Sequence, residues 1–157
     1  MKLFFKTVMN LLKNIPNLYI AENWGQLDLA QPPLTFPCVL VDLEQVNYIQ
    51  QGCLRQEGEG DLVLTIADRM YGGLENITPE ILQEREFILL DKIDAIHAIL
   101  HGKAGGEMFS NLIRVKIQKQ SRQDSIRAFI ITYKFSYVDI ISSIQYTHTK
   151  LSPLLSN

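Results

Sequence analysis

Residues 113–137 read IRVKIQKQSRQDSIRAFIITYKFSY, and the fold class follows from their pattern. Apolar and polar residues alternate over 113–118 and again over 129–137. A period of two is typical of strands that bury one face. Because the polar segment 121–125 separates the two runs, the pattern predicts a long antiparallel hairpin.

A long helix is predicted upstream of this hairpin, over residues 79–100. Thr78-Pro79-Glu80 combines a capping residue, a proline suited to the first turn and a carboxylate near the positive end of the helix dipole. The apolar stripe that follows is interrupted at Glu86, and Gly102 marks the end of the helix. The stripe consists of Leu82, Leu89, Ile93, Ile96 and Leu100.

The N-terminal part predicts a shorter helix and then a strand. Its apolar residues recur at helical spacing until Pro16 ends the pattern. Residues 17–33 are mixed in character and predict an irregular connection. The short, β-branched run at 37–43 predicts a central strand. The helical stripe consists of Phe4, Val8, Leu11 and Ile15.

The remaining segments complete the fold prediction. Residues 50–60 are polar and contain three glycines before a strand at 62–66, which predicts a hairpin with a mobile tip. Residues 140–146 predict a short last strand, and 147–157 a C-terminal arm. The order is α-β-β-α-β-β, with this optional final strand. We therefore predict a single α+β domain over 1–146, with two α-helices packed on one face of an antiparallel β-sheet.

The composition narrows the class of protein. A net charge of -2 and a pI near 5.9 give no strong field for nucleic acid, so DNA binding requires a local patch. Lys6 and Lys13 interrupt the apolar N-terminal run, and neither a signal peptide nor a membrane span is expected. Cys38 and Cys53 are too few for a disulfide framework or a zinc site, and we expect reduced thiols.

The junction QPPLTFPCVLV at residues 31–41, taken with the element order, resembles the tail terminator (tail completion) family of long-tailed phages and prophages. In that family a helix and an irregular stretch lead into the first strand through a proline and an apolar run. Here residues 4–15, 17–33 and 37–41 fill these places. The resemblance continues across nearly the whole chain, although residues 43–60 are longer than a minimal member needs.

The resemblance implies a structural virion protein. It implies a homo-oligomeric ring, commonly sixfold, that caps the head-proximal end of the tail tube and joins it to the head-side connector. The expected partners are therefore further copies of this chain, the tail tube protein and the head-side connector or neck proteins. The expected location is the tail or neck of a virion assembled in the bacterial host cytoplasm.

Two segments are candidates for contact with neighbouring subunits or with the tube, namely the glycine-containing loop and the C-terminal arm. Exposed strand edges also favour β-addition between subunits. The candidate residues are Gly52, Leu54, Arg55, Glu57 and Glu59 in the loop, and Leu151, Leu154 and Leu155 in the arm.

The last hairpin also gathers basic residues near Tyr133 and Phe135. In a ring they are candidates for non-specific DNA contact in the lumen. The alternative interpretation is that alternating charges simply form the solvated face of a strand. The residues are Arg114, Lys116, Lys119, Arg122 and Arg127.

Two patterns resemble metal sites but suit structural roles better. His97 and His101 share one helix face, but the span lacks a glutamate base, and His101 suits the negative end of the helix dipole. Glu57, Glu59 and Asp61 alternate with glycine but supply too few oxygens for a calcium loop. We expect no metal and no cofactor.

No motif for nucleophilic catalysis is present, and we do not expect an enzyme. Two rival readings remain. A neck or head–tail connector protein of the same particle would share the oligomeric character but join the portal side. A small soluble ligand-binding or enzymatic domain would instead carry a polar pocket between sheet and helices, with His97 among its residues.

Overall fold

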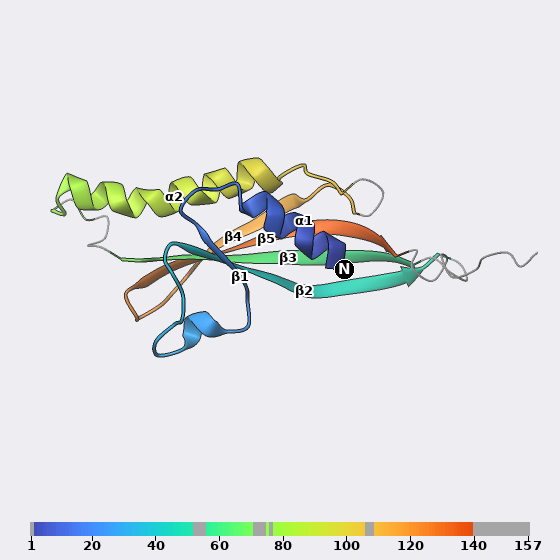
Figure 1. Cartoon of the computed structure of the whole chain (residues 1–157), viewed down its shortest axis with the longest axis horizontal. Helices are drawn as coiled ribbons and strands as arrows, with labels where there is room; N and C mark the ends of the chain where they lie inside the picture. The colour runs from blue at the N-terminus through green and yellow to red at the C-terminus, as the bar shows by residue number, and fades with distance from the viewer. Residues whose placement is uncertain (1, 52–55, 71–74, 76, 106–108, 140–157) are drawn as a thin grey trace, which may run out of the picture.

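The computed structural model describes residues 2–51, 56–70, 75, 77–105 and 109–139. Both α-helices lie on one face of a single sheet, and a short 3-10 helix lies on the other (Figure 1). The predicted α+β class and helix-on-sheet arrangement are confirmed. In chain order the elements are α1 (Lys2–Leu12), β1 (Tyr19–Glu22), the 3-10 helix η1 (Gln26–Asp28), β2 (Cys38–Gln50), β3 (Gln56–Arg69), α2 (Glu80–Leu100), β4 (Ile113–Gln120) and β5 (Ile126–Asp139).

The sheet has the strand order β1-β2-β3-β5-β4. β3 and β5 pair along their whole lengths, from Gln56 opposite Asp139 to Arg69 opposite Ile126. β4 and β5 form the predicted hairpin, with its turn at 121–125. These pairs and the β2–β3 pair are antiparallel, whereas β1 is parallel to β2, so the sheet is mixed rather than purely antiparallel.

The segment predicted to be irregular, residues 17–33, contains two elements. β1 pairs with residues 38–41 of β2, and η1 follows it. β1 has only four residues, two of them half-buried. A strand this short shows too little alternation for a period of two to be recognised.

β3 begins at Gln56, earlier than the predicted start near residue 62. Gly58 and Gly60 therefore lie within a paired strand rather than in a loop. A Cβ added at Gly60 would lie 2.9 Å from Cζ of Phe135 and 3.0 Å from Cγ2 of Val46. Glycine here permits close packing of neighbouring side chains on the strand. The predicted hairpin tip, the strand at 140–146 and the arm lie outside the described residues.

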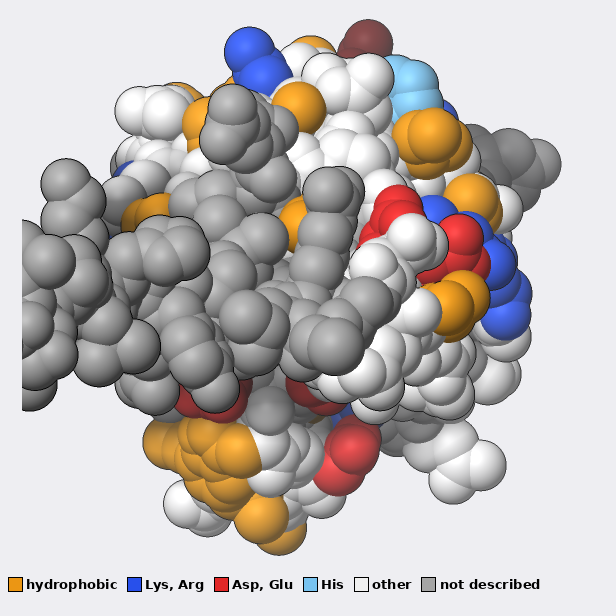
Figure 2. Space-filling model, turned by 90° about the vertical axis from the view of Figure 1, so that its right-hand side faces the viewer, with side chains coloured by type: hydrophobic (Ala, Val, Ile, Leu, Met, Phe, Trp, Pro, Cys, Tyr) orange, Lys and Arg blue, Asp and Glu red, His pale blue; other side chains and the backbone are white. Residues whose placement is uncertain are grey.

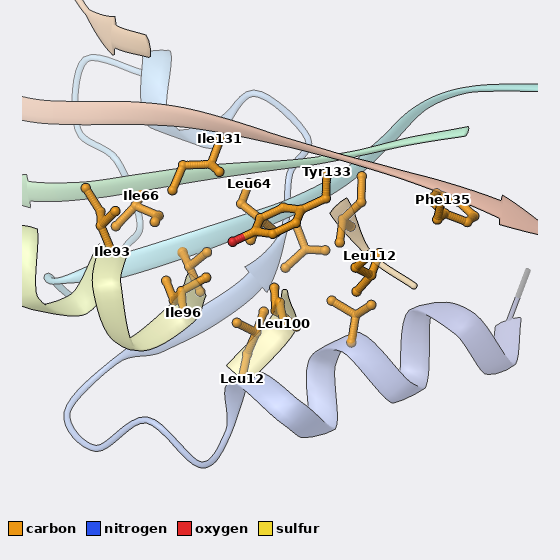
Figure 3. Packing of buried hydrophobic residues seen from close by; sticks show 14 of the residues in the cluster. Leu12, Leu64, Ile66, Ile93, Ile96, Leu100, Leu112, Ile131, Tyr133 and Phe135 are labelled. Atoms are coloured by element: carbon orange, nitrogen blue, oxygen red, sulfur yellow. The ribbon is translucent and has the colours of Figure 1, made fainter. Parts of the chain in front are cut away.

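The main hydrophobic core lies between the helices and the sheet. Leu12 and Leu100 meet Tyr133 and Leu64 there, and the Tyr133 ring points from β5 toward the helices (Figure 3). Phe4 stacks on Phe135 with ring centroids 4.1 Å apart. The predicted stripes are largely buried, from α1 Phe4, Val8 and Leu12, and from α2 Leu89, Ile93, Ile96 and Leu100. In α1, however, Leu12 rather than Leu11 occupies the buried position.

A second, smaller core covers one end of the opposite face. Leu27 of η1 packs there with Leu40 of β2 and Ala128 of β5. Cys38 is part of this cluster, and its burial raises the pKa of the thiol to about 12. It is a free, buried thiol rather than a reactive one.

Candidate assembly surfaces

β4 is an outer strand of the sheet, and its free edge pairs with no strand in the part of the chain that the structure describes. Ile113, Val115 and Ile117 on this strand are 54%, 49% and 48% exposed. Hydrophobic, basic and acidic side chains are interspersed at the right-hand side of Figure 2. Open backbone groups flanked by exposed apolar side chains form a template for pairing with another strand.

The five basic residues of the hairpin do not form one patch. Arg114 lies opposite the buried Tyr133, and Lys119 lies opposite Phe129, so both are on the helix side of the sheet. Lys116 lies opposite Thr132, on the helix-free side. The other two, Arg122 and Arg127, are engaged in contacts within the subunit.

Arg122 lies in the β4–β5 turn and holds the segment around η1. Its Nη1 lies 2.6 Å from Oδ1 of Asp28, and its Nη2 donates to the carbonyl of Leu27 at 2.9 Å. It also donates from Nε to the Asp124 carboxylate at 3.0 Å. The bond to Asp124 is the main cause that raises the pKa of Arg122, and it lowers the pKa of Asp124. Arg122 therefore joins the turn to η1.

Arg127 of β5 contacts the buried Glu86 of α2. Its Nη1 donates to the Glu86 carbonyl at 3.0 Å and lies 3.5 Å from Oε2 of the same residue. Asp68, opposite Arg127 on β3, is buried as well, and its pKa is raised chiefly by this burial. Sequence reasoning missed this pair, although the acid interrupting the apolar stripe of α2 was a signal, because a buried carboxylate requires compensation.

The strands on the far edge from β4 carry acidic rather than basic residues. β1 and β2 contain no lysine or arginine, whereas β4 contains no aspartate or glutamate. Glu57, Glu59 and Asp61 follow one another on the helix-free face of β3. Glu59 and Asp61 line a groove of about 280 Å³ that also includes Lys134 and residues of β2. Charge is thus segregated across the width of the sheet.

β2 continues past the end of β1 and forms a second open edge. β1 pairs only with residues 38–41, and no other described strand lies outside residues 43–50. Glu44 is exposed at a bulge, and Tyr48 and Ile49 are 43% and 64% exposed. The sheet therefore presents two long, unlike edges: β4 carries Arg114, Lys116 and Lys119, whereas residues 43–50 of β2 carry one charged side chain, Glu44.

His97 and His101 contact each other and neighbouring residues of the same subunit. Their ring centroids are 4.6 Å apart, and the Tyr133 hydroxyl lies 3.5 Å from Nδ1 of His97. Nδ1 of His101 accepts a hydrogen bond from the backbone N–H of Arg114 at 3.3 Å. Burial lowers the pKa of His97, with Arg114 and His101 adding to the effect, while burial raises the pKa of Tyr133 to about 12.

Among the residues that the structure describes, no three His, Cys, Asp or Glu side chains come close enough to hold a metal ion. No described helix is long and apolar enough to cross a membrane. Of the candidate contact residues, Glu57 and Glu59 lie on β3. The others lie outside the described part of the chain, namely Gly52, Leu54, Arg55, Leu151, Leu154 and Leu155.

Comparisons with known proteins support the fold. No protein-family model matches the chain, and no curated protein matches it in sequence. The fold is similar to that of a chain in the solved virion of a native gene transfer agent particle, with a TM-score of 0.57 and 12% sequence identity. The match covers 84% of this chain and 92% of that one, so the two share the architecture of nearly the whole domain.

Proposed function

We propose that this chain is a structural protein of a phage-type virion that assembles into a homo-oligomeric ring. The observation that carries the proposal is the β4 edge, which pairs with no other described strand and on which Ile113, Val115 and Ile117 are about half exposed. A surface of this kind favours pairing with another subunit. The shared architecture with a virion chain, over most of both lengths, supports the same reading.

Within the virion we propose the role of a tail terminator. The ring would cap the head-proximal end of the tail tube, stop its growth by covering the polymerising face, and join it to the head-side connector. The element order resembling that family supports this role. The two ends of the subunit also differ, which supports the same role, because η1 and the Arg122 contact that holds it lie at one end of the sheet only (Figure 1). The role is steric and requires no catalysis.

Contact with DNA in the lumen is a further part of this proposal, and the described geometry limits which residues serve it. Lys116 lies on the helix-free face, whereas Arg122 and Arg127 are held by carboxylates of the same subunit. We therefore assign such contact to Lys116 before the other basic residues. Because few cations take part, DNA affinity should be weak and should fall only gradually as salt is raised.

The test is to measure the mass of the purified chain by light scattering across concentration and to image the same fractions by negative stain. The chain is then mixed with tubes polymerised from the tail tube protein of the same particle. We expect rings of about six subunits, free or at tube ends. A chain that stays monomeric at every concentration and ignores tubes would contradict the proposal. Rings that bind the portal side instead would identify a connector.

A further inference from the structure

We propose that the subunits of the ring join through the two unlike edges of the sheet. The basic β4 edge of one copy docks antiparallel on residues 43–50 of β2 in the next copy. This inference rests on the ring proposed above and names the surfaces that close it. Because the two surfaces differ, the contact is heterologous, and repeated contacts of this type generate a ring when the rotation between copies closes.

Charge selects this pairing over the alternative of two β4 edges meeting. β4 carries Arg114, Lys116 and Lys119 and no acid, so two copies of it would place like charges opposite each other. Lysines on an edge strand are a common means of preventing such self-pairing. The edge of β2 offers the opposite charge, from Glu44 on that strand and Glu59 beside it on β3.

Strand direction and length agree with this pairing. β4 is antiparallel to β5, β5 to β3, and β3 to β2, so β4 runs antiparallel to β2 when the strands of all copies follow one ring axis. β4 has eight residues, and the part of β2 beyond β1 that we assign to the contact, residues 43–50, has the same length. β1 blocks the rest of the β2 edge.

The stagger between copies follows from strand tilt. Through the ladder, Ile113 lies level with Gln45 of β2, and Gln120 lies level with Cys38. In closed sheets the strands tilt by about 40° from the axis, and four strand spacings of about 4.8 Å then shift neighbouring copies by about 16 Å, or about five residues. With the bulky helix layer on the convex side and the usual right-handed twist, this shift moves residues 113–120 beside residues 50–43 of the next copy.

The contact would also cover exposed apolar side chains. Ile113, Val115 and Ile117 come from one edge, and Tyr48 and Ile49 come from the other. All five are at least two-fifths exposed in the single subunit. Burial of these side chains contributes favourable free energy to association but does not select a partner surface. The charged residues determine which edge of the next copy is bound.

Two charge-reversed variants test the pairing. The first carries Lys116→Glu and Lys119→Glu on β4, and the second carries Glu44→Lys and Glu59→Lys on the acidic side. Lys6→Glu with Lys13→Glu, at exposed positions outside β4 and β2, is the control for the first variant, because it makes the same charge change. Thermal unfolding of each variant verifies the fold, and light scattering across concentration measures association.

We expect each variant alone to associate about tenfold or more weakly than the wild type and the control. An equimolar mixture of the two variants should restore rings, because each reversed edge then finds a complementary one. If either variant alone forms rings at the wild-type concentration, the edge pairing is wrong, whereas the ring itself stands. If the wild-type chain never self-associates, with or without tubes, both the pairing and the proposed function are wrong.

Discussion

Glu86 is a buried carboxylate beneath α2, and Arg127 is the cation beside it. Arg127→Met would leave this carboxylate near the buried Asp68 without its guanidinium. We expect a loss of about 3 kcal/mol in the free energy of unfolding, measured by urea denaturation. Lys6→Met, an exposed site on α1, is the control and should change stability by less than about 0.5 kcal/mol.

The companion variant distinguishes a buried charge from a lost packing contact. Arg127→Met combined with Glu86→Leu removes both charges and should recover most of the lost stability, because an apolar pair replaces a buried ion pair at little cost. A single variant as stable as the control, or a double variant less stable than the single one, would contradict this account of the pair.

Burial of Asp68 predicts how the stability of the folded chain changes with pH. Burial raises its pKa in the folded chain above the ordinary value of 3.8, so the folded state binds the proton more tightly than the unfolded state. Ionisation of Asp68 therefore lowers stability as pH rises from about 3.8 through the raised value. Asp68→Asn should raise the unfolding temperature at pH 7 and have no such effect well below pH 3.8. If the difference in unfolding temperature between the wild type and Asp68→Asn stays the same across this pH range, Asp68 is not the group responsible.

At the scale of helices and strands, most of the fold was predictable because each element has a repeated pattern. α2 follows its predicted apolar stripe, although Pro79 rather than Thr78 is its N-cap and no side chain caps it, and β4 with β5 forms the predicted hairpin. β1 was missed because four residues carry too little periodicity. The start of β3 was misplaced because Gly58 and Gly60 resemble turn residues, although their role is close packing.

The candidate surfaces were predictable in residue type but not in arrangement. The basic residues of the last hairpin were identified, but spacing along one chain did not reveal that Arg122 pairs with Asp28, 94 residues away. The acidic residues at and beside the β2 edge, Glu44 and Glu59, come from β2 and β3, which become neighbours only through the ladder. Contacts between distant segments depend on the tertiary fold, and no local pattern encodes them.

Gly60 tests the packing role of the β3 glycines. Gly60→Ala would place a methyl group 2.9 Å from Phe135 and 3.1 Å from the carbonyl oxygen of Gln45. We expect a loss of about 1–3 kcal/mol, seen as a lower unfolding temperature. Glu59→Ala, next to it on the exposed face, should leave the temperature nearly unchanged. If Gly60→Ala and Glu59→Ala change the unfolding temperature equally, strand propensity rather than the close contact of Gly60 with Phe135 determines the effect.

For the whole molecule, lateral and axial contacts are assigned to different parts. The two edges proposed to join copies around the ring lie in the described sheet, on β4 and β2. The proposed contacts with a tube or connector would instead lie along the ring axis, near the ends of the strands. The described sheet ends at Asp139 of β5, and residues 140–157 follow it in the chain. The proposed division predicts that one set of contacts can be removed without the other.

Deletion of residues 147–157 separates the two sets. The hydrophobic core extends from Phe4 to Tyr137, so the truncated chain should keep its unfolding temperature and, by the edge pairing, its ring mass in light scattering. Binding to tube ends, measured by co-sedimentation, should fall. A full-length chain with Leu151, Leu154 and Leu155 all changed to Ser keeps the length but loses the apolar side chains, and it should behave like the deletion. Loss of ring mass in either variant would instead place the arm in the lateral contact, because the edges alone would then be insufficient to hold the copies together.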